Sequence, residues 1–572
     1  MKISGHSFRL AWYGIVTLLG VFAYFYGLDS QHIPKNGDEY PYEHITRMTA
    51  SSGHLLPLQS QLNGMRNTKP PLLTWQGIAS TDWGKHWTLW RLRFPSVVYT
   101  LLTAIMAFLL ARKISNRLET GFVALLTYLA FYSTFRYGRP YLTNAPETFW
   151  LFLPFFVLLY WRPASFSSRL LVPLALGIGT GIGLLYKSFA LLAPVGVTIS
   201  WWYLHYRDYQ RQTFLAQDFW KIVVVATIAL GLFSMWFLLD PDPHAIWTEF
   251  VVSENVGKIA SPSGSYLAKL LWSTDSIWTM LVAYPFNAGA LVFPMAALMF
   301  TSYKRRNELD DAEKLLWMWV IVLVVFFTIP SQRTPRNLLS AMPALAVLCA
   351  LNWERISRKA FVASVLVAGA TAATIVYLSA HLQQELADAH LYSPAYWVLA
   401  ALTGVLVLLA VFVPSLTRST TNAAIILAYC CLGAALRPFD GEHGNYGPGV
   451  QRYAKGKDVW VPCDFRAKDE GYRFIFPGTN VHGYKDTDQS RTVSELEKQY
   501  PRFVVRSPLN EPGCRDCKII GERLDLHGRH SSAENKEMLQ GNVLGHLVFE
   551  ERFIESPESS SSTPTRVMEG CR

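Results

Sequence analysis

The stretch FRLAWYGIVTLLGVFAYFYGL, residues 8–28, decides the fold class of this 572-residue chain, because it holds only one charged side chain, Arg9. A helix of about 20 apolar residues crosses a bilayer, where no water satisfies the backbone. The stretch therefore predicts a membrane span. A cleaved signal peptide is the alternative. No small-residue cleavage site is evident before Asp29, so an uncleaved span is favoured.

Similar apolar stretches follow it, and they predict about thirteen spans in all. Several are short, and Lys187 divides the stretch near 170–205, so the count lies between about eleven and fourteen. The candidate spans are 8–28, 92–111, 120–135, 147–161, 170–186, 189–205, 222–239, 279–302, 315–330, 338–352, 361–380, 395–414 and 422–436.

The charged residues separate two regions of the chain. Residues 1–436 hold 53 of the 94 Asp, Glu, Lys and Arg side chains, and residues 437–572 hold the other 41. We expect a multi-span α-helical membrane domain over 1–436, with long outer loops at 29–91 and 240–278. A soluble α/β domain is expected over 437–572. Its Ser-, Glu- and Pro-rich end, 556–572, is expected to be disordered. The composition excludes collagen-like and small disulfide-rich chains.

Basic residues orient the predicted spans. With the N-terminus in the cytoplasm, every short inner loop carries a Lys or Arg, as the positive-inside rule requires. An odd number of spans then places 437–572 outside. The net charge of +10 comes from the membrane region, which carries +11 against −1 for the tail, so the charge gives little support for nucleic-acid binding. The inner basic residues are Arg112, Lys113, Arg117, Arg162, Arg169, Arg207, Arg211, Lys221, Lys304, Arg305, Arg306, Lys314, Arg355, Arg358, Lys359 and Arg418.

The sequence pattern of residues 437–572 predicts strands and a short helix. Strands are predicted at 458–462, 473–476 and 503–506, and a helix starts near Thr492, with Glu495 at capping-box spacing. An oxidising outside would permit disulfides, and a structural disulfide is favoured over a redox pair or a zinc site. The tail cysteines are Cys463, Cys514, Cys517 and Cys571, whereas Cys349, Cys430 and Cys431 lie in or near spans.

Several cations fall on the predicted outer side, against the orientation rule. Retained near a bilayer in different loops, they suggest a shared anionic ligand. Snorkelling to lipid headgroups is the alternative for any single one. These residues are Lys69, Arg136, Arg139, Lys187, Lys258, Arg333 and Arg336.

The first outer loop holds an acidic pair, Asp38-Glu39, directly after the first span. Adjacent carboxylates beside a bilayer are costly unless they are paired or used. A carboxylate there can accept a proton from an attacking hydroxyl. The alternative is a solvated helix N-terminus. Lys69, held by Pro70-Pro71, could neutralise a phosphate leaving group.

The order of these pieces resembles the GT-C glycosyltransferases that use polyprenyl-phosphate sugars. It is most similar to ArnT-like aminoarabinose transferases of lipid A and to protein O-mannosyltransferases. The resemblance covers residues 1 to about 350. It rests on Asp38-Glu39, Gly53 to Pro57, Lys69-Pro70-Pro71-Leu72 with Trp75, Gly183–Ser188, Trp236, Phe250–Lys258 and Gln332–Pro343.

The resemblance implies roles for particular residues. Asp38 would activate or orient the acceptor, with Glu39 and Glu147 as further catalytic candidates. Tyr42 and Trp75 could stack on a sugar, but an interfacial aromatic belt is the favoured interpretation, because Trp and Tyr collect there. His44 and His54 are expected to be structural. The donor-phosphate candidates are Lys69, Arg333, Arg336 and Lys187, and the substrate-binding candidates are Tyr42, Trp75, Asn144 and Glu254.

The sequence also departs from the family pattern. Asn144 stands where a second acid is usual, Thr68 replaces a Glu before the lysine, and Asn337 replaces a Tyr. No His lies around 261–269. The usual positions of divalent-cation ligands are therefore not matched, and the departures weaken aminoarabinose as the sugar.

Together these features predict a monomeric glycosyltransferase of the bacterial inner membrane, in contact with membrane lipids. It would transfer a sugar from a polyprenyl-phosphate donor to a glycolipid such as lipid A, another glycan or a protein at the outer face. No nucleic-acid partner is expected. The alternatives are a transporter or flippase of lipid-linked glycans and a polysaccharide polymerase or ligase. A transporter tends to place charges mid-span and to show related halves, which this sequence does not.

Overall fold

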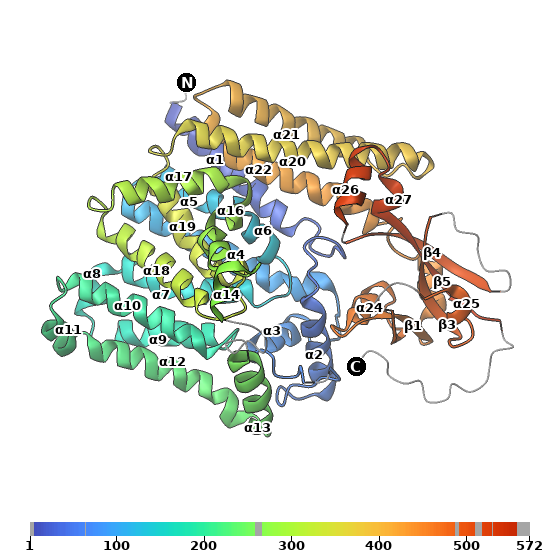
Figure 1. Cartoon of the computed structure of the whole chain (residues 1–572), viewed down its shortest axis with the longest axis horizontal. Helices are drawn as coiled ribbons and strands as arrows, with labels where there is room; N and C mark the ends of the chain where they lie inside the picture. The colour runs from blue at the N-terminus through green and yellow to red at the C-terminus, as the bar shows by residue number, and fades with distance from the viewer. Residues whose placement is uncertain are drawn as a thin grey trace.

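The computed structural model describes residues 5–62, 64–257, 266–486, 491–509, 517–528 and 530–557. A large helical bundle makes up most of the molecule, and a smaller domain with a β-sheet lies at one end (Figure 1). The two helices of the first outer loop, α2 (Glu39–Ser52) and α3 (Leu72–Ser80), lie between the bundle and the sheet domain.

Helices occupy all thirteen predicted stretches. Seven helices or helix pairs of the described chain are long and apolar enough to cross a membrane, so the chain is a multi-span membrane protein. The count of thirteen spans stays a prediction, because the remaining helices are shorter or carry more charge. The bundle contains α1 (Gly5–Phe25), α4 (Leu89–Ser115), α5 (Leu118–Ala130), α6 (Tyr132–Tyr137), α7 (Asn144–Tyr160), α8 (Arg162–Ser167), α9 (Leu171–Leu184), η1 (Phe189–Leu191), α10 (Leu192–Tyr206), α11 (Arg211–Gln217), α12 (Phe219–Leu239), α15 (Ile277–Leu281), α16 (Ala283–Ala288), η3 (Gly289–Leu291), α17 (Val292–Lys304), α18 (Asp311–Thr328), η4 (Pro335–Ala341), α19 (Met342–Leu351), α20 (Arg358–Glu385), η5 (Ala387–Ala389), α21 (Pro394–Phe412) and α22 (Thr417–Leu436).

The short helices form the centre of the bundle. Nearly all side chains of α5 and α19 are buried, and both helices pack on α4 and on each other. A helix that is apolar on every side must be buried or face lipid. The long helices α12 and α21 expose most of their apolar side chains, which suits a lipid-facing surface.

The second outer loop is helical where it is described. It contains α13 (Pro243–Ala245), a π-helix, η2 (Ile246–Val256), and α14 (Tyr266–Trp272). Residues 258–265, which include the predicted outer cation Lys258, lie outside the described residues. Helices with π geometry are rare and are found frequently at functional sites.

The C-terminal domain is built on a mixed five-stranded sheet in the order β2-β1-β3-β5-β4. Strand β1 is parallel to β2 and β3, whereas β5 is antiparallel to β3 and β4. This α/β domain follows the expectation from sequence. Its elements are η6 (Arg437–Phe439), α23 (Pro448–Ala454), β1 (Asp458–Cys463), η7 (Lys468–Gly471), α24 (Tyr472–Ile475), β2 (Asn480–Lys485), α25 (Val493–Leu496), β3 (Arg502–Ser507), β4 (Lys518–Leu526), α26 (Ser532–Leu539), α27 (Leu544–Leu547) and β5 (Val548–Glu555).

Local predictions for this domain had mixed outcomes. The strands at 458–462 and 503–506 are confirmed as β1 and β3. The strand at 473–476 is wrong, because that segment forms α24, where Arg473 donates to Glu470 and to the carbonyl of Val481. Helix α25 follows Thr492 as expected, but the Thr492 side chain makes no capping hydrogen bond. The disordered end expected at 556–572 lies, from 558 onward, outside the described residues.

The cysteines fall into two groups. Cys463 and Cys517 are both disulfide-bonded, so the expected disulfide of the C-terminal domain is present. Cys349, Cys430 and Cys431 are free thiols buried in helices. Disulfides form and persist mainly in oxidising compartments.

The C-terminal domain contacts the rest of the chain at several places. In one contact, the Tyr377 hydroxyl of α20 donates to the carbonyl of Leu539, at the end of α26. In a second contact, α2 packs on η7. Trp87, before α4, stacks there on Phe474 of α24, with ring centroids 6.0 Å apart. The second contact lies beside the acidic pair.

Candidate functional site

Helix α2 fixes the position of the acidic pair. Asp38 is the residue before the helix and Glu39 is its first residue. Pro41 follows within the first turn, where the lack of an N–H costs nothing. Gly53 ends the helix at φ 74°, the left-handed conformation that glycine adopts without strain. The sequence thus fixes both ends of α2.

Glu39 is completely buried and belongs to the scaffold. Arg93 of α4 donates Nε and Nη2 to its two carboxylate oxygens, at 2.9 and 3.0 Å. The backbone N–H groups of Tyr141 and Asn36 donate to them as well, at 2.7 and 2.8 Å. Burial raises the pKa of Glu39, but Arg93 and Lys35 outweigh it and hold the pKa below its usual value. These contacts leave no oxygen for substrate, so the expectation of a catalytic Glu39 is not supported.

Asp38 has different surroundings from its neighbour. Its side chain is 41% exposed, and Arg336 of η4 donates Nη1 to Oδ2 at 2.5 Å. The same guanidinium donates Nε and Nη2 to Oδ1 of Asn144, at 2.9 and 2.7 Å. Asn144 thus supplies the acceptor oxygen at the position where an acid was expected.

Glu147 lies one turn further along α7 and pairs with a second predicted cation. Its Oε1 accepts from Nζ of Lys187 at 2.9 Å and from the Ser340 hydroxyl at 3.3 Å. Among the described residues, Oε2 of Glu147 is buried with no hydrogen-bond partner. Burial, and then the charges of Arg336 and Lys69, lower the pKa of Lys187. Arg336 and Lys69 therefore both lie within electrostatic reach of Lys187.

Lys69 connects the first outer loop to the π-helix. Its Nζ donates to Glu254 of η2 and, at 2.9 Å, to the carbonyl of Thr68. Close by, Glu249 of η2 accepts from the backbone N–H of Asn67 at 2.8 Å. Two carboxylates on η2 thus hold the segment that presents Lys69.

Tyr42 lies among these charges. It is partly buried against Leu73 and Tyr186. Burial raises the pKa of its phenol, and the carboxylates of Asp38, Glu254 and Glu147 act in the same direction, against Arg336. We call this group the outer charge cluster. It consists of Asp38, Tyr42, Lys69, Asn144, Glu147, Lys187, Glu254 and Arg336.

Arg333 and Trp75 make no hydrogen bond or ion pair with the outer charge cluster among the residues that the structure describes. Arg333 is buried, and its Nε and Nη1 donate to the carbonyls of Thr328 and Asp275. Trp75 is partly exposed and donates its indole N–H to the carbonyl of Leu55. The contacts of both side chains hold loops, and their expected roles in phosphate and substrate binding stay predictions.

Two further outer cations also bind backbone. Arg136 donates to the carbonyls of Pro34 and Lys35. Arg139 donates to the carbonyls of Tyr24 and Tyr26, near the end of α1. Both side chains therefore hold loop backbone, and an anionic ligand for them stays a prediction.

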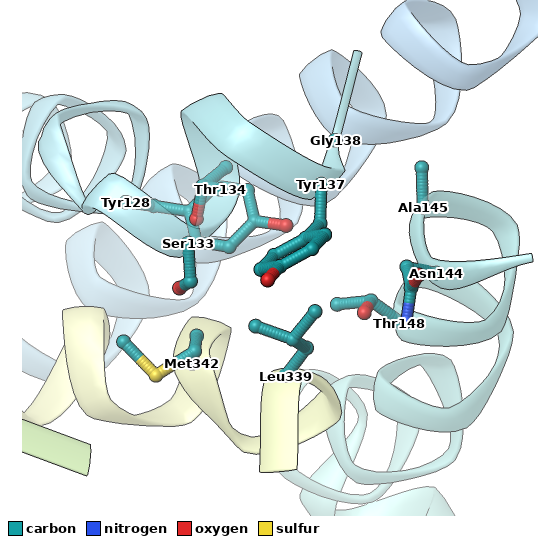
Figure 2. Close-up of a pocket in the computed structure, with 10 residues that line it drawn as sticks. All are labelled: Tyr128, Ser133, Thr134, Tyr137, Gly138, Asn144, Ala145, Thr148, Leu339 and Met342. Carbon is teal, nitrogen blue, oxygen red and sulfur yellow. The ribbon is translucent and has the colours of Figure 1, made fainter. Parts of the chain in front are cut away.

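A small cavity of about 10 Å³ lies behind the cluster, between α6, α7 and η4. Figure 2 shows the Tyr137 ring between α7 and Leu339, with Asn144 and Thr148 at the α7 side. The Arg336 guanidinium lies 5.0 Å from the centroid of that ring. This volume holds about one water molecule, so the cavity is too small for a sugar.

The side chains do not fit a protein-bound metal. Among the described residues, no group of three His, Cys, Asp or Glu side chains could hold a metal ion. We therefore derive no step through a metal. His44, expected to be structural, is buried and contacts Glu470 of the C-terminal domain at 2.7 Å.

Two arginines beside the acidic pair were not predicted. Arg93 is at the edge of a predicted span, and that single charge was the available signal. Arg466 of the C-terminal domain donates Nη1 to Oδ1 of Asp38 at 3.3 Å. No local motif marks Arg466, because its role depends on how two domains dock.

Fold and site together define a class: a multi-span membrane protein with a soluble C-terminal domain and a charge cluster at its helix ends. Comparison with known proteins supports this class. Residues 14–250 match the model of the dolichyl-phosphate-mannose-protein mannosyltransferase family. The crystal structure of ArnT from Cupriavidus metallidurans bound to undecaprenyl phosphate has a similar fold. Its TM-score is 0.59 at 15% identity, over 89% of this chain and 94% of that one.

Within this class, the chain is similar to curated ArnT-type enzymes. It is 26% identical, over 60% of each chain, to undecaprenyl phosphate-alpha-4-amino-4-deoxy-L-arabinose arabinosyl transferase 2 of Proteus mirabilis. It is 25% identical, over 58% of each chain, to the corresponding transferase of Aeromonas hydrophila. The chain thus matches about three fifths of the length of these relatives. The ArnT-like resemblance inferred from the sequence is confirmed.

Proposed function

We propose that this protein is a glycosyltransferase that moves a sugar from a polyprenyl-phosphate donor to an acceptor at the outer face of the bacterial inner membrane. One observation carries the proposal. Segments far apart in sequence bring cations and carboxylates together in the outer charge cluster. The relatives named as undecaprenyl phosphate-linked arabinosyl transferases support the choice of donor.

The cations of the cluster suit a lipid phosphate. Lys69, Lys187 and Arg336 are each paired with a carboxylate or amide oxygen. A phosphate that enters from the membrane would exchange with these partners and take over their hydrogen bonds. Charge-assisted bonds of this kind stabilise a phosphate leaving group most strongly where water is excluded.

The Asp38 carboxylate is placed to accept the proton of the acceptor hydroxyl. In the transfer, a bond forms between the anomeric carbon of the sugar and the acceptor oxygen, and the bond from that carbon to the phosphate oxygen breaks. The acceptor proton passes to the Asp38 carboxylate, and the bonding electron pair leaves with the polyprenyl phosphate. Asp38 is the more exposed member of its pair with Arg336, at 41% against 22%, so an acceptor can reach it.

The same proposal includes the orientation of the protein in the membrane and its acceptor, and it takes the protein as a monomer. The N-terminus lies in the cytoplasm and the C-terminal domain in the periplasm, in keeping with the basic inner loops and the disulfide-bonded Cys463 and Cys517. The acceptor is a glycolipid, another glycan or a protein.

The test is donor cleavage in proteoliposomes. Purified protein is incubated with a polyprenyl-phosphate sugar and a membrane extract as acceptor, and the lipids are followed by mass spectrometry. We expect free polyprenyl phosphate to appear together with a glycosylated acceptor. Donor that crosses the bilayer without cleavage would contradict the proposal and indicate a flippase. Joining of donor sugars into a long chain would indicate a polymerase.

A further inference from the structure

The C-terminal domain brings one side chain to the outer charge cluster. Arg466 lies in the loop between β1 and η7, and its guanidinium is 3.3 Å from Oδ1 of Asp38. Arg336 binds the other carboxylate oxygen from the bundle. The carboxylate of Asp38 therefore lies between two arginines from two domains.

The loop that presents Arg466 has a defined local structure. Oδ1 of Asp464 accepts from the backbone N–H groups of Arg466 and Lys468, at 2.9 and 3.2 Å. Ala467 adopts φ 58°, a left-handed conformation that a β-carbon disfavours. A residue other than glycine keeps this conformation only where its surroundings fix it. The position of Arg466 is thus built into the loop.

The next turn of this segment binds the middle of α2. Glu470 is completely buried and accepts from Arg47 at 2.6 and 2.9 Å, and its Oε1 lies 2.7 Å from Nδ1 of His44. Burial opposes ionisation, but the hydrogen bonds from Arg47 and His44 hold the pKa of Glu470 well below its usual value. Four residues along the chain from Arg466, this carboxylate holds η7 against α2.

We propose that Arg466 is a positioning residue for Asp38, so that the C-terminal domain forms part of the active site. The inference rests on the proposed function, because it assigns Asp38 as the group that accepts the proton. With one oxygen held by Arg336 and the other by Arg466, the carboxylate plane is fixed before the acceptor arrives. A fixed geometry lowers the barrier to proton transfer. The donor phosphate is bound by Lys69, Lys187 and the two N–H groups of Arg336 that now face Asn144.

The kinetic test compares Arg466→Ala and Arg466→Lys with Arg452→Ala. Arg452 is an exposed arginine of the same domain that donates to the carbonyl of Pro448. We expect Arg466→Ala to lower kcat about fivefold with KM for the donor within about twofold. Lysine at this position, or added methylguanidinium with the alanine variant, should restore part of the loss. An unchanged kcat, or an equal loss in Arg452→Ala, would overturn the proposal.

A second measurement needs no transfer activity. Amide hydrogen exchange of residues 36–40 is followed in the full-length wild type and in Arg466→Ala. We expect faster exchange in the variant, because Asp38, at the start of α2, loses one of its two arginine contacts. Identical exchange would overturn the positioning role. An inactive wild type with normal exchange would instead count against the proposed function, so the two failures are distinguishable.

Discussion

The two ends of the contact between α2 and the C-terminal domain differ in how fully their charges are satisfied. At the middle of the helix, Glu470 is fully buried and holds hydrogen bonds or ion pairs to His44, Arg47 and Arg473. At its start, Asp38 is 41% exposed and holds one arginine on each oxygen. The first end is closed to other molecules, and the second is open to them.

The buried contacts of Glu470 therefore stabilise the docking of the two domains, whereas the exposed Asp38 can take part in a reaction. A buried ion pair with every acceptor in use stabilises one arrangement, and breaking it is costly. A partly exposed carboxylate beside cations can exchange partners when a substrate arrives. Asp38 and Glu39 show the same contrast between adjacent residues, since Glu39 accepts from Arg93 and from two backbone N–H groups.

The largest effect is expected on sugar transfer, for a substitution of Asp38 at the exposed end of the contact. Asp38→Asn keeps the size of the side chain and removes its ability to take a proton, so transfer should fall about a thousandfold. Asp29→Asn is the control, because Asp29 lies in the same outer loop, is 57% exposed and pairs only loosely with Arg437 at 3.4 Å. Donor turnover in membranes measures both. Full activity of Asp38→Asn would show that Asp38 does not accept the proton.

Glu39→Gln should act on stability instead. The change leaves the buried Arg93 without its charge partner, which costs about 3 kcal/mol of unfolding free energy. Thermal unfolding in detergent checks this, with Glu354→Gln, at a 71% exposed position, as the neutral control. If Glu39→Gln were stable but could not transfer sugar, Glu39 would be a catalytic residue and the assignment to the scaffold would be wrong.

At the buried end of the contact, we expect a smaller loss of stability, and this loss depends on pH. Glu470→Gln should lower stability by about 2 kcal/mol at neutral pH, because hydrogen bonds to a charged group are lost. The folded pKa of Glu470 is depressed, so its stabilisation is complete above the usual carboxyl pKa of 4.5 and is lost as the pH falls below it.

The measurement is the difference in unfolding free energy between wild type and Glu470→Gln over a pH series. It should stay constant above about pH 5.5 and shrink below about 4.5. A difference that grows on acidification would have the wrong sign for a depressed carboxyl pKa and would contradict this role of Glu470.

The smallest effects are expected for single cations of the cluster, because the others remain. Lys69→Ala and Lys187→Ala should each raise KM for the donor about tenfold. Lys85→Ala is the control, since Lys85 is a 70% exposed lysine of the same outer loop. Initial rates over a range of donor concentrations test this. A change in kcat alone would place these lysines elsewhere in the reaction.

Much of the helical fold could be predicted from the sequence, because apolar runs of span length leave few other structures open to them. All thirteen stretches are helical. The strand expected at 473–476 was wrong for a physical reason. Its short alternation fits a strand, but contacts of Arg473 with Glu470 and Val481 favour a helical turn. Tertiary contacts of this kind leave no trace in a four-residue pattern.

The site was predicted only in part. The order of acid, lysine and arginine motifs pointed to Asp38, Lys69, Lys187 and Arg336, which lie together in the structure. The same rule also selected Arg333, whose partners are backbone carbonyls. An outer cation that binds an anion and one that binds a loop look alike in sequence. Only the folded positions of acceptors separate them.

The most direct test of the central claim measures bound and cleaved donor in the same proteoliposomes, for the wild type and Asp38→Asn. The claim is that Asp38 serves the acceptor while the cations hold the donor phosphate. It predicts that Asp38→Asn binds the polyprenyl-phosphate sugar about as well as the wild type, because the cations that bind the phosphate are unchanged, while cleavage nearly stops. Loss of donor binding with cleavage unchanged per bound molecule would contradict it.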